Sequence, residues 1–108
     1  MLKKRNRASK KEVDLLFKQG KVFNSVNLTF RFILKDDSFP ARISFIAPKN
    51  IAKLAVKRNF LRRLGYNVLR KYIDQFPPGT LGVFVFKKHQ DDSLTIENEI
   101  KNILFKIN

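Results

Sequence analysis

The stretch LGVFVFK, residues 81–87, constrains the fold more than any other part of this 108-residue sequence. It is apolar nearly throughout and lacks the alternation of a strand that has one face in water. Such runs are typical of strands that other elements cover on both faces. The chain is long enough for one domain, and its 44% hydrophobic content suffices for a layered core.

Two more strands are predicted upstream. Residues 26–34, VNLTFRFIL, alternate, so that one face carries Leu28, Phe30, Phe32 and Leu34 and the other carries Thr29, Arg31 and Ile33. Residues 41–47, ARISFIA, form the next strand, which Pro48 ends. The sequence leaves open whether Val22 and Phe23 add a further strand.

The N-terminal region combines a basic arm with a short helix. Residues 1–11 hold six Lys or Arg side chains and are expected to form a flexible basic arm. Ser9 and Glu12 match a capping box, which predicts the start of a helix that ends at Gly20. One face of this helix carries Val13, Leu16 and Phe17.

Two longer helices are predicted in the rest of the chain. One begins within residues 51–54 and runs to about Ile73, before FPPG stops it. The other closes the chain, capped by Asp92 or Ser93, with an apolar side formed by Leu94, Ile100, Ile103, Leu104 and Ile107. The order helix, strand, strand, helix, strand, helix predicts an α+β domain with one sheet layer and helices packed on it.

The charge balance points to a polyanionic partner. Lys and Arg number 23 against 9 Asp and Glu, which gives a formal net charge of +14. Self-repulsion of this size opposes folding, and nucleic acid or an acidic membrane surface would relieve it. We expect no membrane span, because no apolar run approaches roughly 20 residues, and no signal peptide is visible. The sequence has no Cys, which excludes disulfides and makes the cytoplasm the expected compartment.

Residues 55–70, AVKRNFLRRLGYNVLR, segregate their charge on one side of the predicted helix. The apolar stripe consists of Leu61, Leu64, Val68 and Tyr72, and the opposite side carries Arg58, Asn59, Arg62, Arg63 and Arg70. Lys49, Lys53, Lys57 and Lys71 extend the basic field. A solvated face normally mixes signs, but no acid occurs between Lys49 and Tyr72, while four of the nine acids lie in residues 91–99.

We therefore interpret this side as a nucleic-acid surface, with Arg forks gripping phosphates. Asn59 either contacts the nucleic acid or orients Arg63, and the sequence does not decide between these. An independent protein enzyme is poorly supported: His89 is the only His, no catalytic residue stands out, and no acidic pair has a metal-site signature. Asp91 and Asp92 are expected to bind a cation only weakly.

Several segments, in order, resemble the bacterial ribonuclease P protein component. KRNFLRRL at 57–64 resembles the Arg-Asn-Arg helix of that family. The other similar segments are LKKRNR at 2–7, DLLFKQGKVF at 14–23, ARISFIAPKNIAKLAVKRN at 41–59 and LTIENEIKNILFKI at 94–107. The resemblance therefore extends over nearly the whole chain.

The resemblance implies a single domain over residues 1–108 with a mostly antiparallel sheet of about four strands, three helices and a left-handed βαβ crossover, against the usual handedness. It also implies a function. The RNA subunit of ribonuclease P removes the 5′ leader of precursor tRNA with Mg²⁺, and the protein binds that RNA and the leader. No tightly bound cofactor is expected on the protein, and neither DNA nor membrane is an expected partner.

Site residues follow from the same resemblance. RNA contacts are expected from Arg5, Asn6, Arg7, Lys49, Lys53, Arg58, Asn59, Arg62 and Arg63, and the charge pattern of the helix adds Lys57 and Arg70. The leader is expected between the first helix and the sheet, beside Phe17 and either Phe30 or Phe32. The chain departs from the family pattern at Val13, Asn50, Phe60, Tyr66 and Gly65, the last at a helix cost of about 1 kcal/mol. Phe60 either packs in the core or stacks on RNA.

Three alternatives remain at this stage. Another RNA-binding module, such as a ribosomal protein, would use a similar basic helix. A DNA-binding helix-turn-helix is disfavoured, because the segment before residues 51–73 reads as a strand. A membrane-surface role would need bulky apolar residues exposed opposite the charges, where a sheet can instead cover them.

Overall fold

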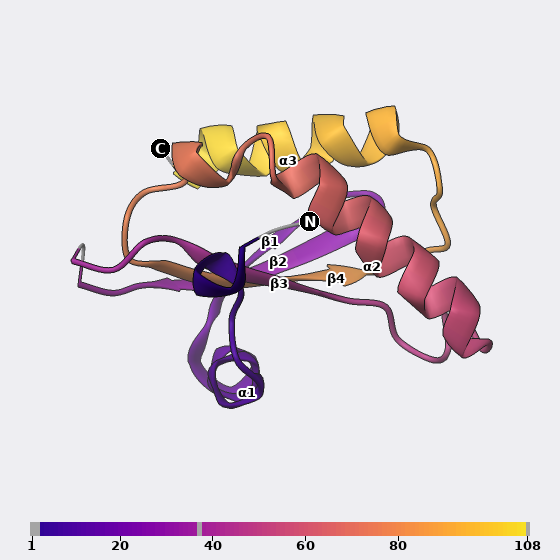
Figure 1. Ribbon diagram of the computed structural model, residues 1–108, viewed down its shortest axis with the longest axis horizontal. Coiled ribbons are helices and arrows are strands. Elements are labelled where there is room, and N and C mark those ends of the chain that lie inside the picture. Colours follow the sequence, from indigo (N-terminus) through magenta and orange to yellow (C-terminus); the bar gives the residue numbers. More distant parts are fainter. Residues whose placement is uncertain (1–2, 37, 108) are drawn as a thin grey trace.

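The computed structural model describes residues 3–36 and 38–107, in which four strands form one mixed sheet (Figure 1). The strands are β1 (Lys21–Asn24), β2 (Leu28–Leu34), β3 (Arg42–Ile46) and β4 (Thr80–Phe86). Their order across the sheet is β1-β2-β4-β3, with β3 parallel to β4 and the other pairs antiparallel. The predicted α+β class is confirmed, and Val22 and Phe23 do belong to a strand.

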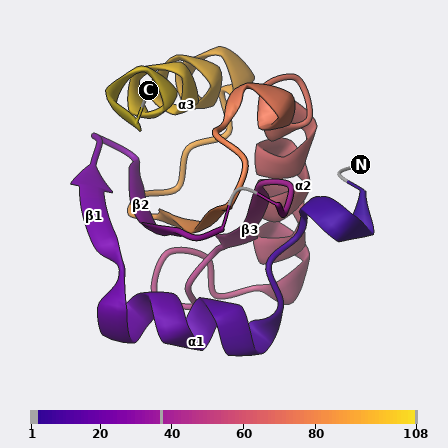
Figure 2. The ribbon, with the colours of Figure 1, turned by 90° about the vertical axis from the view of Figure 1, so that its left-hand side faces the viewer.

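Helices cover both faces of the sheet. Helix α1 (Lys10–Gln19) lies on one face, and α2 (Ala55–Leu69) and α3 (Ser93–Ile107) lie on the other, as Figures 1 and 2 show. Short 3-10 helices, η1 (Lys4–Asn6) and η2 (Ile73–Gln75), flank α1 and α2. Strand β4 is central and, as predicted, buried on both faces: Leu81 and Val83 pack with Leu16 of α1, and Phe84 and Phe86 face α2 and α3.

A continuous row of aromatic rings forms the core between the sheet and the two long helices. The row runs through Phe23, Phe32, Phe30, Phe84, Phe45 and Tyr66, with neighbouring ring centroids 4.3–5.4 Å apart. It begins on β1, crosses every strand of the sheet and ends on α2. Such contacts add about 0.5–1.5 kcal/mol per pair beyond burial, so the row fixes α2 against the sheet.

The predicted helix ends are partly correct. At α1, the Ser9 hydroxyl accepts from the Glu12 N–H and the Glu12 carboxylate accepts from the Ser9 N–H, which confirms the capping box, and Gly20 ends the helix. Helix α2 begins at Ala55 and ends at Leu69, four residues before the predicted Ile73. The remaining residues continue as turns and as η2.

The predicted apolar side of α3 is confirmed at Ile100, Ile103, Leu104 and Ile107 and is wrong at Leu94. Asp92 caps it, because its carboxylate accepts from the Leu94 N–H and the Thr95 hydroxyl. Leu94 was predicted to be apolar core but is 61% exposed, and Ile96 is buried in its place. At about 100° per residue, Leu94 lies roughly 160° from Ile96 around the helix, so it points away from the face that Ile96, Ile100 and Ile103 share.

A buried carboxylate of α3 holds the β1–β2 turn. Glu99 accepts hydrogen bonds from the Asn27 N–H at 2.8 Å, from the Asn27 side-chain amide at 2.6 Å and from the Ser25 hydroxyl. Its exposed fraction is 7%. Because buried charges need such partners, this contact ties the turn to α3. Sequence patterning did not predict it.

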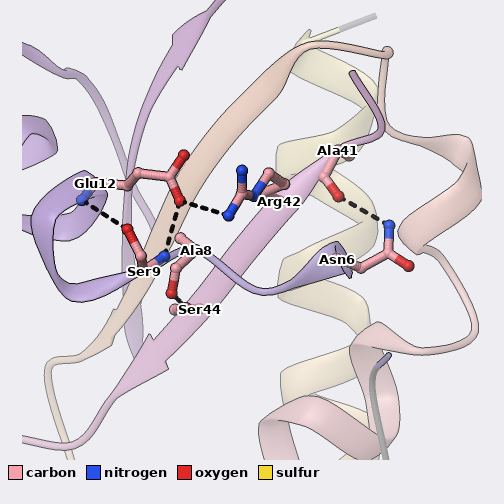
Figure 3. Close-up of polar contacts among 7 residues, drawn as sticks. All are labelled: Asn6, Ala8, Ser9, Glu12, Ala41, Arg42 and Ser44. Atoms are coloured by element: carbon pink, nitrogen blue, oxygen red, sulfur yellow. Dashed lines mark hydrogen bonds and ion pairs between the residues drawn. The ribbon is translucent and has the colours of Figure 1, made fainter. Parts of the chain in front are cut away.

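The expected flexible arm is instead docked over its described part. The Asn6 side-chain amide donates to the Ala41 carbonyl at 2.9 Å, and the Ser44 hydroxyl donates to the Ala8 carbonyl at 2.8 Å (Figure 3). Strand β3 lies at the edge of the sheet, and the arm runs beside it, bonded to the residue before the strand and to the Ser44 side chain within it. Lys10 already belongs to α1, and residues 1–2 lie outside the described part.

Gly65 allows α2 to approach the sheet. A Cβ at this position would lie 2.6 Å from two ring atoms of Phe45, which is buried in the aromatic row. Gly65→Ala should therefore lower the free energy of unfolding by about 1–3 kcal/mol, despite the better helix propensity of Ala. Urea denaturation measures this, with Asn67→Ala on the exposed side of α2 as the control. A Gly65→Ala protein as stable as the wild type would contradict the packing argument.

Candidate nucleic-acid interface

Two arginines of α2 and one arginine of the arm line a single hollow. Arg7, Asn59, Arg62, Arg63 and Tyr66 surround about 230 Å³. The Arg7 guanidinium lies over the Tyr66 ring, 4.8 Å from its centroid. Tyr66 is itself buried, and its hydroxyl accepts a hydrogen bond from the Phe45 N–H at 3.1 Å. The end of the aromatic row therefore positions the arm arginine beside those of the helix.

A second hollow of about 330 Å³ adjoins the first. It lies between the end of β3 and the start of α2 and is lined by Phe45, Ile46, Ala47, Ala55, Arg58, Asn59 and Arg62. Asn59 and Arg62 border both hollows. The Asn59 side-chain oxygen accepts a hydrogen bond from the Arg62 guanidinium, so the amide orients Arg62 and not Arg63.

Carboxylates do not neutralise this surface. In residues 3–36 and 38–107, ion pairs join Arg42 to Glu12 at 3.0 Å and Lys71 to Glu97 at 3.9 Å. Neither pair involves Arg58, Arg62 or Arg63. The guanidinium charge on α2 is therefore available to an external anion. An anion in the first hollow would meet three Arg side chains, Arg7, Arg62 and Arg63.

Arg58 has a structural contact that the sequence did not reveal. Its guanidinium Nη1 donates to the carbonyls of Ala52 and Lys53, at 3.0 and 2.8 Å. These carbonyls belong to the connection that leads into α2. Arg58 therefore holds this connection and is only partly exposed, whereas Arg62 and Arg63 are exposed.

The other predicted RNA contacts are spread more widely. Exposed basic side chains that line neither hollow are Arg5, Lys49, Lys53, Lys57 and Arg70. Asn6, which was expected to contact RNA, is only 7% exposed, and its amide is bonded to the Ala41 carbonyl. It therefore supports the arm and does not face solvent. Its neighbour Arg7 reaches the hollow in its place.

The aromatic residues expected beside α1 are also corrected. Phe17 is 46% exposed on α1. Phe30 and Phe32 are buried at 0% and 4% on the opposite face of the sheet, beneath α2 and α3. Alternation showed that these two residues share a face, but it does not say which helix covers that face.

Arg31, on the face of β2 turned toward α1, takes the place expected for a second aromatic. Its guanidinium lies 5.2 Å from the centroid of the Phe17 ring. The Thr29 hydroxyl donates to the Asn24 side-chain oxygen on the same face at 3.1 Å. Ile46 lies on this face too and also lines the second hollow, so the surface beside α1 continues to the α2 arginines. The only sequence signal for Arg31 was the strand alternation, which placed it on the face opposite to Phe30 and Phe32.

Arg58 and Arg63 should separate structural from binding roles. Arg58→Ala removes two hydrogen bonds to the α2 connection and should lower the free energy of unfolding by about 1 kcal/mol. Arg63→Ala removes an exposed side chain and should change it by less than about 0.5 kcal/mol. Urea denaturation of both variants measures the difference. Equal stabilities would show that the Arg58 contacts contribute nothing to the fold.

Among the described residues, no helix is long and apolar enough to cross a membrane, and no group of three or more His, Asp or Glu side chains is placed to hold a metal ion. Solved structures with the same fold are ribonuclease P proteins. The protein from Thermotoga maritima is 21% identical, with a TM-score of 0.81 over 96% of this chain and 99% of that chain. The protein from Staphylococcus aureus is 13% identical, with a TM-score of 0.77 over 98% and 100% of the two chains.

A search of curated protein sequences found no match. The family model described as Ribonuclease P, however, matches residues 1–108, the full length of the sequence. The match agrees with the fold and with the basic helix at the expected place. This chain therefore belongs to the ribonuclease P protein family, which acts in tRNA processing.

Proposed function

We propose that this chain is the RNA-binding protein subunit of ribonuclease P. It binds the catalytic RNA subunit and the single-stranded 5′ leader of precursor tRNA, and it assists the Mg²⁺-dependent removal of that leader. The observation that supports this most directly is the hollow in which Arg7, Arg62 and Arg63 meet without a carboxylate. Family membership supports the proposed reaction, and the hollow supports the proposed binding of an RNA backbone.

Binding to the RNA subunit is mainly electrostatic in this proposal. Each Arg that pairs with a phosphate releases a condensed counterion, so affinity falls as salt rises. The guanidinium fork makes two parallel hydrogen bonds to one phosphate, which favours Arg over Lys at the centre of the surface. The exposed lysines around the hollows add positive charge, and an ammonium group can pair with a phosphate in many orientations.

The leader binds beside α1, on the same face of the sheet as Arg31. A single strand exposes its bases, and Phe17 offers a ring that stacks on them with little sequence preference. The Arg31 guanidinium lies over that ring and is placed to pair with a leader phosphate. Holding the RNA subunit and the leader on one rigid protein raises their effective concentration without any chemistry by the protein.

We assign the chain no catalytic residue. Bond cleavage in this proposal is carried out by the RNA subunit, in keeping with the family to which the chain belongs. The Mg²⁺ that assists cleavage would be held by RNA phosphates, and we assign this ion no protein ligand. The cytoplasm remains the expected compartment.

Reconstitution tests this function against a general RNA-binding role such as that of a ribosomal protein. Adding the protein to a bacterial ribonuclease P RNA should restore cleavage of precursor tRNA at a Mg²⁺ concentration where the RNA alone is inactive. Arg62→Ala/Arg63→Ala should weaken binding and reduce the salt slope by about two. The control Lys88→Ala/Lys101→Ala removes the same charge from exposed sites away from the hollows and should behave like the wild type. Unchanged cleavage on adding the wild-type protein would refute the proposal.

The leader surface has its own test. Phe17→Ala should weaken binding of leader-bearing precursor tRNA by roughly 5- to 100-fold, because one stacked base is lost. Affinity for mature tRNA should not change. Phe39→Ala, which removes another half-exposed ring, is the matched control. Equal losses for precursor and mature tRNA would mean that Phe17 supports the fold and not the leader.

A further inference from the structure

Phe60 of α2 is exposed beside the arginine hollow. It neither belongs to the hydrophobic core nor lines the hollow. It is 49% exposed, which excludes the core-packing alternative of the sequence analysis. Val56, one turn earlier on the same side of the helix, is 66% exposed. The two side chains form a small exposed apolar patch, and its place beside the arginines makes it a candidate contact for the same partner.

The position of Phe60 links it to the RNA surface. At about 100° per residue, Arg63 lies roughly 60° from Phe60 around α2 and roughly 40° from Asn59. Arg63 therefore stands between Phe60 and the hollow that Asn59 lines. A polynucleotide with a phosphate at Arg63 places its neighbouring nucleotide within reach of the Phe60 ring.

We propose that Phe60 is a stacking platform for an unpaired base of the RNA whose phosphates occupy the arginine hollow. This deepens the proposed function and rests on it. The RNA subunit is the occupant favoured by charge, because the side chains next to Phe60 include Lys57 and Arg63 and no acid lies between Lys49 and Tyr72. A protein partner with an ordinary mixed surface would bring unpaired cations against these residues.

A membrane surface fits this patch less well. An interfacial helix needs a wide apolar face, but the apolar stripe of α2 is buried against the sheet and only Val56 and Phe60 remain on its outer side. A single ring offers little area to lipid. The same ring is well matched to one base, since every base presents a π-face to an aromatic side chain.

Salt dependence separates stacking from phosphate pairing. Phe60→Ala should weaken binding to a bacterial ribonuclease P RNA by roughly 5- to 100-fold and leave the salt slope unchanged, because no counterion is involved. Phe60→Leu keeps an apolar side chain without a π-face and should lose nearly as much. Phe105→Ala removes a ring that is 84% exposed on α3 and is the matched control, with affinity unchanged. Thermal unfolding confirms that each variant is folded.

The absence of Trp from the sequence provides a direct readout. Phe60→Trp should bind the RNA like the wild type, and its emission should be quenched on binding, while the emission of Phe105→Trp should not change.

Three results would overturn the inference: Phe60→Ala within about twofold of wild-type affinity, Phe60→Leu equal to wild type, or an unquenched Phe60→Trp complex. Binding to phosphatidylglycerol vesicles that Phe60→Ala abolishes, with RNA affinity intact, would assign the patch to a membrane instead. If the wild type does not bind the RNA, the proposed function fails as well; if it binds and only the Phe60 result is negative, only the stacking inference fails.

Discussion

The aromatic row across the sheet is the contact on which the rest of the structure depends. Phe30, Phe84 and Phe45 stack from strand to strand, and Tyr66 extends the row onto α2. The Tyr66 hydroxyl accepts a hydrogen bond from the Phe45 N–H in the core, and the Arg7 guanidinium lies over the Tyr66 ring. Core packing therefore fixes Tyr66, and through it Arg7, at the arginine hollow, and the exposed Arg62 and Arg63 complete it. A preorganised site of this kind loses less conformational entropy on binding.

Three glutamates make their contacts away from the arginine hollow. Glu12 caps α1 and pairs with Arg42, Glu97 pairs with Lys71, and Glu99 is used inside the fold. With a net charge of +14, the folded protein pays a repulsive cost that these contacts offset only locally. An anion bound by the folded chain alone would stabilise it further by mass action.

Local chemistry made much of the fold predictable, because caps, alternation and continuous apolar runs act over a few residues. The capping box at Ser9, the strand alternation of β2 and the buried β4 are all of this kind. What the sequence could not give depends on contacts between distant segments. The direction in which Phe30 points, the docking of Asn6 on Ala41 and the Glu99 contact with Asn27 all require the assembled sheet. For the same reason, the basic side of α2 was predicted, but its meeting with Arg7 and the backbone contacts of Arg58 were not.

The strand order has a consequence for the newly made chain. Strands β2 and β3 follow each other in sequence but are separated in the sheet by β4. On the ribosome, their inner edges therefore stay unpaired while the arginines of α2 are being synthesised, and the sheet closes only after β4 has been made. Long-range pairing of this kind is slow and leaves strand edges open in the meantime. During translation, the highly basic segment thus exists before the scaffold that gives it a shape.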